Sequence, residues 1–224
     1  MTTEPGGPHA HPARSVEIEL KFDVDDATGL PDWSGLPGVT SVGAAEPRDL
    51  DAVYLDTADL ALARAGYAVR RRTGGPDEGW HIKGPRDAEG GRVELHWPLG
   101  AEGTVPDAVA AALAAVAAST DYAPIARIRN QRTAYALQDA DGGLVAEFVD
   151  DLVVATDERD GTRRTWREWE FELGPAAPAS GDARAALFAA AEDAVRSAGG
   201  REAASASKLA RALGACAQRR TPGA

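Results

Sequence analysis

Residues 16–23 read VEIELKFD, and this stretch alternates apolar and charged side chains without interruption. Its apolar positions are Val16, Ile18, Leu20 and Phe22, and its charged positions are Glu17, Glu19, Lys21 and Asp23. Successive side chains of a strand point to opposite faces, so this period predicts a β-strand with one apolar and one charged face. The stretch therefore predicts a sheet protein whose polar strand faces carry its chemistry.

The same alternation recurs along most of the chain. Seven further segments are predicted strands: 51–57, 66–72, 79–84, 91–99, 125–137, 144–156 and 163–173. Segments rich in Gly, Asp and Pro, such as Asp139–Gly143 and Asp160-Gly161, have the composition of hairpin turns and join consecutive strands. Helices are predicted near 59–65, 107–118, 182–198 and 205–213. The sequence thus predicts an α+β fold with an antiparallel sheet of eight strands and helices packed around it.

Length and charge exclude several classes of protein. The 224 residues include 24 basic and 35 acidic side chains, a formal net charge of −11, which disfavours binding to extended nucleic acid. A single cysteine excludes a disulfide scaffold, and no apolar run approaches the ~18 residues of a membrane span. Residues 1–14 lack the apolar centre of a signal peptide. We expect a soluble cytoplasmic protein, with one domain over 15–214 and disordered tails at 1–14 and 215–224.

Charges on the predicted strand faces are segregated by sign. The first and last strands carry mostly carboxylates and the middle strands mostly cations: Glu17, Glu19 and Lys21; Arg70 and Arg72; His81 and Lys83; Arg92, Glu94 and His96; Arg132; Glu147 and Asp151; Glu168, Glu170 and Glu172. An ordinary solvent-facing sheet is one interpretation, although such faces usually intersperse the two signs. A closed barrel with these faces inside would instead have one acidic and one basic wall.

Two walls of opposite charge match a particular kind of ligand. Arginine forks and lysine ammoniums suit a phosphate chain, and clustered carboxylates beside such an anion need a hard divalent cation. Only three of the 24 basic residues are lysine, namely Lys21, Lys83 and Lys208, so each is a candidate for a position that needs a compact ammonium. This pattern favours metal-assisted phosphoryl chemistry.

A series of motifs in fixed order makes the hypothesis more specific. They are Glu17-Ile18-Glu19-Leu20-Lys21, Tyr54-Leu55-Asp56-Thr57, Leu62 and Gly66 with Val69-Arg70-Arg71-Arg72, Trp80-His81-Ile82-Lys83, Arg92-Val93-Glu94, Arg132-Thr133-Ala134-Tyr135, Glu147 with Asp150-Asp151, Glu168-Trp169-Glu170-Phe171-Glu172, and Ser207-Lys208-Leu209. In this order they resemble the motifs of CYTH domains, the triphosphate tunnel metalloenzymes. Val69 stands where that family has leucine. The resemblance extends over residues 16–213, nearly the whole predicted domain.

The resemblance implies an eight-stranded antiparallel barrel whose interior binds a triphosphate and Mg²⁺ or Mn²⁺. Substrate would be bound by Lys21, Arg70, Arg72, Lys83, Arg92, Arg132 and Lys208, and metal by Glu17, Glu19, Glu147, Glu170 and Glu172. Glu17, Glu19, Lys21 and Glu170 would be catalytic. Glu94 would be either a further ligand or a carboxylate that orients its basic neighbours. Whether Arg127, Arg129, Asp150 and Asp151 face the tunnel stays open, because the alternation places Asp150 and the two arginines on the other parity unless a bulge intervenes.

The family includes several activities that share these residues. They are inorganic triphosphatase, thiamine-triphosphatase and class IV adenylyl cyclase, and a CYTH domain can also serve as a non-catalytic polyphosphate-binding module. We expect hydrolysis of the terminal phosphate of inorganic triphosphate, because this substrate requires only the tunnel residues. A pocket for thiamine or adenine that includes Trp33 or Trp97 is the alternative. The partner is then a small molecule rather than nucleic acid or membrane. The helical CHAD domain that accompanies some CYTH domains does not fit in this chain length, which favours a stand-alone enzyme, and the oligomeric state is open.

Overall fold

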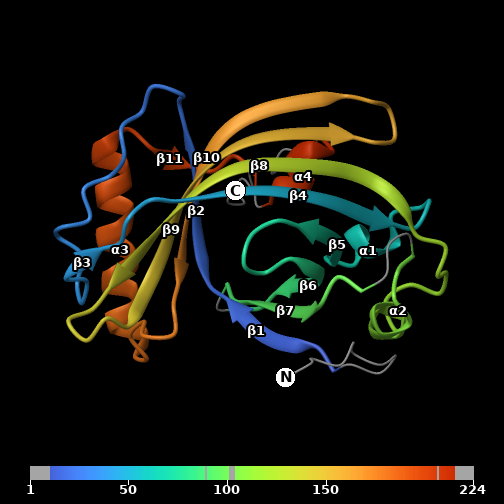
Figure 1. Cartoon of the computed structure of the whole chain (residues 1–224), viewed down its shortest axis with the longest axis horizontal. Coiled ribbons are helices and arrows are strands. Elements are labelled where there is room, and N and C mark those ends of the chain that lie inside the picture. Colours follow the sequence, from blue (N-terminus) through green and yellow to red (C-terminus); the bar gives the residue numbers. More distant parts are fainter. Residues whose placement is uncertain (1–10, 89, 101–103, 206, 215–224) are drawn as a thin grey trace, which may run out of the picture. The chain divides into compact units, whose positions relative to one another are not determined.

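The computed structural model describes residues 11–88, 90–100, 104–205 and 207–214, which form two compact units. Unit 1 consists of the described residues of Met1–Ile18, Asp49–Arg129 and Ala155–Thr162. Unit 2 consists of those of Glu19–Arg48, Asn130–Val154 and Arg163–Ala224. Three long strands contribute residues to both units: β4 (Glu46–Asp56), β8 (Ala123–Gln138) and β9 (Leu144–Asp157). The elements are labelled in Figure 1.

Unit 1 contains an antiparallel sheet with two short helices. Its hydrogen-bonded neighbours follow the order β1 (Ala13–Glu17), β7 (Arg92–Trp97), β6 (Gly79–Arg86), β5 (Ala68–Thr73) and β4, as Figure 1 shows. Val69, Trp80, Ile82 and Trp97 of this sheet form a core with residues of α1 (Ala61–Arg64) and α2 (Asp107–Leu113). Because side chains alternate, this packing leaves the other face to the charged residues of β5, β6 and β7.

Unit 2 is built in the same way around a longer helix. Its strand order is β8, β9, β10 (Arg163–Leu173), β2 (Glu19–Val24) and β11 (Arg201–Glu202), and β3 (Ser41–Val42) pairs with β8. The helix α3 (Gly181–Ala198) packs its Leu187, Ala191 and Val195 against aromatic side chains of β2, β9 and β10. The short helix α4 (Lys208–Ala212) follows β11. Alternation then directs Lys21 and Glu170 to the face opposite α3.

Both ends of α3 have the signals that helices need. At its N-terminus the Ser180 hydroxyl accepts a hydrogen bond from the backbone N–H of Ala183 at 3.2 Å. At its C-terminus Gly199 has a φ of 103°, a left-handed conformation that other residues adopt only with strain. The helix is thereby fixed in length, and its apolar stripe stays in register with the sheet.

The predicted α+β class with a mainly antiparallel sheet is confirmed. The described residues contain eleven strands, since the predicted strand 16–23 is divided at Ile18 and the two-residue strands β3 and β11 are added. Ala13 and Arg14, which we placed in the N-terminal tail, pair with His96 and Leu95 in β1. Residues 1–10 and 215–224 of the predicted tails lie outside the described residues. Neither unit closes a barrel through its own described strand pairings, so barrel closure stays a prediction.

The predicted helices occur at the expected places with shorter bounds. The segments 59–65, 107–118 and 205–213 contain α1, α2 and α4, and 182–198 corresponds to α3. The predicted turn at Asp139–Gly143 is closed by a hydrogen bond from the Asp139 N–H to the Gly143 carbonyl at 3.0 Å and by the Asp139 carboxylate, which accepts the Gly143 N–H at 2.7 Å. Among the described residues, no helix is long and apolar enough to cross a membrane.

Candidate active site

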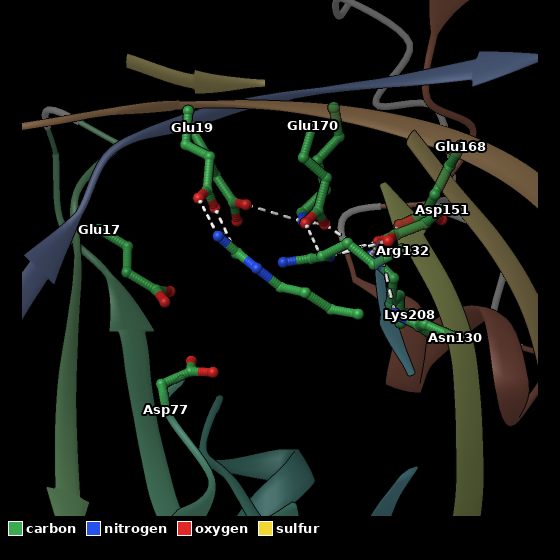
Figure 2. A network of polar contacts seen from close by, with 12 residues as sticks. Glu17, Glu19, Asp77, Asn130, Arg132, Asp151, Glu168, Glu170 and Lys208 are labelled. Carbon is green, nitrogen blue, oxygen red and sulfur yellow. Dashed lines mark hydrogen bonds and ion pairs between the residues drawn. The ribbon is translucent and has the colours of Figure 1, made fainter. Parts of the chain in front are cut away.

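Unit 2 gathers a set of charged side chains that we call the Lys208 cluster. It comes from four strands and one helix, and its members are Glu19 and Lys21 of β2, Arg132 of β8, Asp151 of β9, Glu168 and Glu170 of β10, and Lys208 of α4. Figure 2 shows Arg132, Asp151, Glu170 and Lys208 pointing toward one another. Residues far apart in the sequence thus meet on one polar face.

Three carboxylates of this cluster converge on one ammonium group. The Nζ atom of Lys208 lies 2.9 Å from Asp151 Oδ2, 2.5 Å from Glu168 Oε1 and 2.8 Å from Glu170 Oε1. Asp151, Glu168 and Glu170 each offer an oxygen, and these oxygens all lie within 4.8 Å of one another. All three residues are buried, Asp151 completely. Such an arrangement is suited to hold a cation.

Two further cations complete the cluster. The guanidinium of Arg132 binds Asp151 in a bidentate manner, at 2.8 Å from Nε to Oδ1 and 2.7 Å from Nη2 to Oδ2, and its Nη2 also donates to Glu170 Oε2 at 2.8 Å. Lys21 is the cross-strand partner of Glu170, to which it donates, and its Nζ lies 2.8 Å from Glu19 Oε2. Each cation of the cluster therefore contacts at least two carboxylates.

Mutual neutralisation keeps these buried groups ionised. Burial would lower the pKa of Lys208, but Asp151, Glu170 and Glu168 raise that pKa well above its usual value. Burial would raise the pKa of Glu170, but Lys208, Lys21 and Arg132 hold it well below the usual range. The pKa of Asp151 is lowered in the same way, against burial, by Lys208 and Arg132. At neutral pH Asp151 and Glu170 are therefore charged, and so is Lys208.

Unit 1 has a second set, the Glu94 cluster, consisting of Glu17, Tyr54, Arg70, His81, Lys83 and Glu94. Here the cations and donors surround a carboxylate. Glu94 Oε1 lies 2.9 Å from His81 Nδ1, 3.6 Å from Arg70 Nη2 and 3.7 Å from Lys83 Nζ. Lys83 also donates to both oxygens of Glu17, at 2.6 and 2.7 Å.

Burial acts differently on the individual members of the Glu94 cluster. It raises the pKa of Glu17, which Lys83 only partly offsets. Glu94, also buried, has its pKa lowered by His81, Lys83 and Arg70. Burial lowers the pKa of His81 to about 4. Arg70 and Arg72 also lower this pKa, whereas Glu94 raises it. His81 is therefore a neutral ring at pH 7.

Three predicted phosphate-binding arginines each form further contacts within unit 1. Arg72 is buried and contacts the carboxylate of Asp77. Arg92 donates from Nε to the Gly84 carbonyl at 2.5 Å and from Nη2 to the Gly66 carbonyl at 3.4 Å. Arg70 donates to the hydroxyl of the buried Tyr54 at 3.3 Å.

The carboxylates of β9 have different partners from those we predicted. Glu147, a predicted metal ligand, binds Arg48 in a bidentate manner at 2.9 and 3.2 Å, and Asp151 stands in the Lys208 cluster instead. Asp150 faces Arg167 at 2.8 Å, as its opposite parity requires. Glu172, another predicted ligand, is half-buried on β10 opposite Glu19. The structure therefore brings Glu19 and Glu170, but not Glu147, into the Lys208 cluster.

The two arginines left open by the sequence both pair with Asp51 of β4. Arg127 donates to Asp51 at 2.6 and 2.9 Å, and Arg129 donates to the same carboxylate at 3.1 Å. Their side chains are 44% and 58% exposed. Trp80 and Trp97 lie in the hydrophobic core of unit 1, and Trp169 lies in that of unit 2.

Comparison with known proteins shows the family of this chain. The sequence model of the CYTH domain matches residues 15–213. This chain belongs to the CYTH family. It is also 37% identical over 215 residues to two Mycobacterium tuberculosis proteins, the uncharacterized proteins Rv2226 (strain H37Rv) and MT2285 (strain CDC 1551), covering 91% of this chain and 41% of each relative. The chain thus spans about two fifths of the length of these relatives.

Solved structures share the CYTH fold of this chain. The PH1819 protein of Pyrococcus horikoshii OT3 superimposes with a TM-score of 0.52 at 16% identity, covering 88% of this chain and 98% of the other. A Bacillus halodurans protein described as a candidate adenylate cyclase gives a TM-score of 0.53 at 16% identity, with coverages of 88% and 97%. At this identity the likeness concerns the fold alone.

The donor set of this CYTH chain fits the divalent metal on which the family depends. Asp151, Glu168 and Glu170 provide only oxygen ligands, as Mg²⁺ and Mn²⁺ prefer. Next to them, the buried Asn130 donates from Nδ2 to Asp151 at 3.4 Å, and its Oδ1 has no hydrogen-bond partner among the described residues. A neutral oxygen without a donor is a suitable additional ligand or water acceptor at such a centre.

Sequence reasoning did not select Glu168 of the Lys208 cluster or Asn130, which lies beside Asp151. Glu168 shares the strand face of Glu170, so alternation could have identified it, but the motif set drew attention to Glu170 and Glu172. Asn130 carries no charge, and the sequence contains no signal for its proximity to Asp151. The tertiary pairing of β8 with β9 alone brings it there.

Proposed function

We propose that this chain hydrolyses the terminal phosphate of a triphosphate in a divalent-metal-dependent reaction, and that the substrate is inorganic triphosphate. The observation that carries the proposal is the convergence of Asp151, Glu168 and Glu170 at 2.5–2.9 Å around Lys208, with Arg132 bound to two of them. Membership of the CYTH family supports the same chemistry. The reaction adds water to the terminal phosphorus, breaks its bridging P–O bond and releases orthophosphate and pyrophosphate.

The cations of the cluster are suited to bind the phosphate chain. Arg132 presents a planar fork that matches two phosphate oxygens, and Lys21 and Lys208 present compact ammoniums. These groups offset the charge that spreads over the phosphoryl oxygens in a loose transition state. The family resemblance adds Arg70, Arg72, Lys83 and Arg92 of unit 1 to the substrate-binding set.

The carboxylates have two tasks in this proposal. Asp151, Glu168 and Glu170 hold the metal, and Glu17 and Glu19 are the further ligands that the resemblance assigns. The bound Mg²⁺ or Mn²⁺ would neutralise phosphate charge and polarise the terminal phosphoryl group. Glu170, whose pKa is held low, remains an acceptor at neutral pH and orients the attacking water. The proton of that water passes to a carboxylate and then to solvent.

The surroundings of the tryptophans favour inorganic triphosphate over a substrate with a base. Trp33 and Trp97, which the sequence left as platforms for thiamine or adenine, are only 5% and 4% exposed. Trp33 instead packs against Phe148, with ring centroids 4.8 Å apart and ring planes tilted by 59°. Inorganic triphosphate needs no such platform, because all its contacts are to phosphate oxygens.

The test is an assay of phosphate release by the wild-type chain and two variants. Triphosphate, thiamine triphosphate and ATP are each incubated with Mg²⁺ or Mn²⁺, and orthophosphate and cyclic AMP are measured. We expect release from triphosphate to exceed that from the other two, and Glu170→Gln, verified as folded by circular dichroism, to reduce it by at least about 100-fold. The matched control Glu158→Gln alters an exposed carboxylate and should retain wild-type turnover.

Several outcomes would replace the proposal. Cyclic AMP formed from ATP would make the chain a cyclase, and preferential hydrolysis of thiamine triphosphate would change the substrate. Tight binding of long polyphosphate without phosphate release, despite added metal, would indicate a non-catalytic binding module. Full activity of Glu170→Gln would remove Glu170 from the reaction.

A further inference from the structure

Lys208 occupies the position among the carboxylates that a metal ion would need. Its ammonium has three N–H donors, and an oxygen of Asp151, Glu168 and Glu170 lies within 2.9 Å of its nitrogen. A divalent cation such as Mg²⁺ would have to coordinate the same oxygens at about 2.0–2.1 Å. The ammonium and the metal therefore compete for one set of oxygens.

The charges of the cluster make simultaneous occupation unfavourable. Its four carboxylates, Glu19, Asp151, Glu168 and Glu170, are already opposed by three cations, Lys21, Arg132 and Lys208. A divalent ion added beside Lys208 would place two positive centres in one buried cage, where repulsion is weakly screened. The incoming metal is accommodated only when a resident cation withdraws, and Lys208 is the one in contact with all three converging carboxylates.

The backbone of α4 is fastened, so only the side chain of Lys208 needs to move. Arg211 of the same helix binds Asp23, and its Cζ lies 4.7 Å from the centre of the Trp166 ring. Arg164 donates to the Ala212 carbonyl at 2.6 Å, and the Ser207 hydroxyl caps the first turn at 3.1 Å. The flexible four-carbon stem of lysine permits the ammonium to swing while the helix stays in place.

We propose that Lys208 is an exchangeable counter-cation, which fills the three-carboxylate site in the metal-free protein and is released from it when a divalent metal binds. The inference rests on the metal dependence in the proposed function. The released ammonium is then available to an oxygen of the phosphate chain. Metal and phosphate therefore bind with positive coupling, because each compensates the charges that the other sets free.

The first experiment measures Mn²⁺ binding without any phosphate compound. Free Mn²⁺ is followed by its paramagnetic resonance signal in titrations of the wild-type chain, Lys208→Met and Arg211→Met, with circular dichroism as a check of folding. We expect Lys208→Met to bind Mn²⁺ about 10-fold or more tighter, since its carboxylates have lost their competitor. Arg211→Met removes a charge from the same helix outside the carboxylate site and should stay within about 2-fold of wild type. Equal or weaker binding by a folded Lys208→Met would overturn the proposal.

A second measurement follows the ammonium of Lys208 in the wild-type chain. The chain has only three lysines, Lys21, Lys83 and Lys208, so labelling of their ε-carbons gives three NMR signals, which Lys→Arg substitutions assign. We expect saturating Mg²⁺ to shift the Lys208 signal most, because its ammonium contacts all three converging carboxylates. A Lys208 signal unchanged at saturating Mg²⁺ would refute the exchange.

The two proposals fail in distinguishable ways. If Lys208→Met binds Mn²⁺ tighter and the wild-type chain releases no phosphate, the exchange stands and the triphosphatase assignment falls. If the wild-type chain hydrolyses triphosphate and Lys208→Met binds Mn²⁺ no more tightly than wild type, the triphosphatase assignment stands and the exchange is refuted.

Discussion

The Lys208 cluster of unit 2 and the Glu94 cluster of unit 1 use the same residue types with opposite polarity. In the first, three carboxylates surround one ammonium at 2.5–2.9 Å. In the second, an imidazole, a guanidinium and an ammonium surround one carboxylate at 2.9–3.7 Å. The first arrangement is suited to hold a cation and the second to hold an anion, which composition alone does not distinguish.

The largest expected effect concerns the cation-binding side of this comparison. Asp151→Asn removes a fully buried carboxylate that contacts both Lys208 and Arg132, so we expect Mn²⁺ affinity to fall by about 100-fold. Asp150→Asn is the matched control, because the adjacent Asp150 is engaged with Arg167. Calorimetric titration with Mn²⁺ on folded variants makes the measurement. Equal losses in both variants would show that the metal does not bind at the Lys208 cluster.

The anion-binding side is tested through Arg70. Its charge-assisted contacts with Glu94 and Tyr54 place the guanidinium for a phosphate oxygen, so Arg70→Ala should raise the KM for triphosphate by about 10-fold or more, with a smaller change in kcat. Tyr54→Phe removes only the hydroxyl that accepts from Arg70, and we expect a rise in KM of about 2- to 5-fold. Steady-state kinetics at saturating metal distinguish the two. An unchanged KM in Arg70→Ala would exclude the Glu94 cluster from substrate binding.

Local periodicity was sufficient to predict which strand faces carry the charges. In β5 and β6 the core residues Val69 and Ile82 alternate with Arg70 and Lys83, and in β10 Trp169 and Phe171 alternate with Glu168 and Glu170. The sequence alone is sufficient for this prediction, because burial of the apolar positions of a strand places the alternating charged positions on its opposite face.

Periodicity could not predict which residue of a face meets which partner. Glu147 and Asp151 point to the same face of β9, but Glu147 binds Arg48 and Asp151 binds Lys208. Those partners come from β4 and α4, about 100 and 57 positions away in the chain, so the choice depends on tertiary packing. Likewise, VEIELKFD divides at Ile18 because β1 pairs with β7 and β2 pairs with β10.

A smaller effect is expected from pH, through His81 of the Glu94 cluster. Burial, together with Arg70 and Arg72, lowers the pKa of His81 to about 4, although Glu94, whose Oε1 lies 2.9 Å from the ring Nδ1, acts in the opposite direction. Between pH 6.5 and 4 the unfolded chain therefore binds a proton that the folded chain does not. The stabilisation is complete above pH 6.5 and declines as the pH falls, by roughly 1–2 kcal/mol down to pH 5.

The measurement compares urea unfolding of wild type and His81→Asn at pH 7, 6 and 5. The difference between their pH slopes isolates His81, and His96→Asn on the neighbouring strand is the control. A wild-type slope equal to that of His81→Asn would mean that His81 keeps the same protonation state in both forms. That result would make the Glu94 cluster more positive at pH 6 than the structure indicates.

The smallest effects are expected outside both clusters, at Arg127 and Arg129. Both donate to Asp51, and their side chains are 44% and 58% exposed, so solvent and salt screen the pairs. We expect Arg127→Ala and Arg129→Ala each to change the free energy of unfolding by less than about 1 kcal/mol and the KM for triphosphate by less than about 2-fold. Denaturant melts and steady-state kinetics check both values. A rise in KM comparable to that of Arg70→Ala would extend the anion-binding surface of unit 1 beyond the Glu94 cluster, because an exposed pair that only stabilises β4 against β8 has no reason to affect substrate affinity.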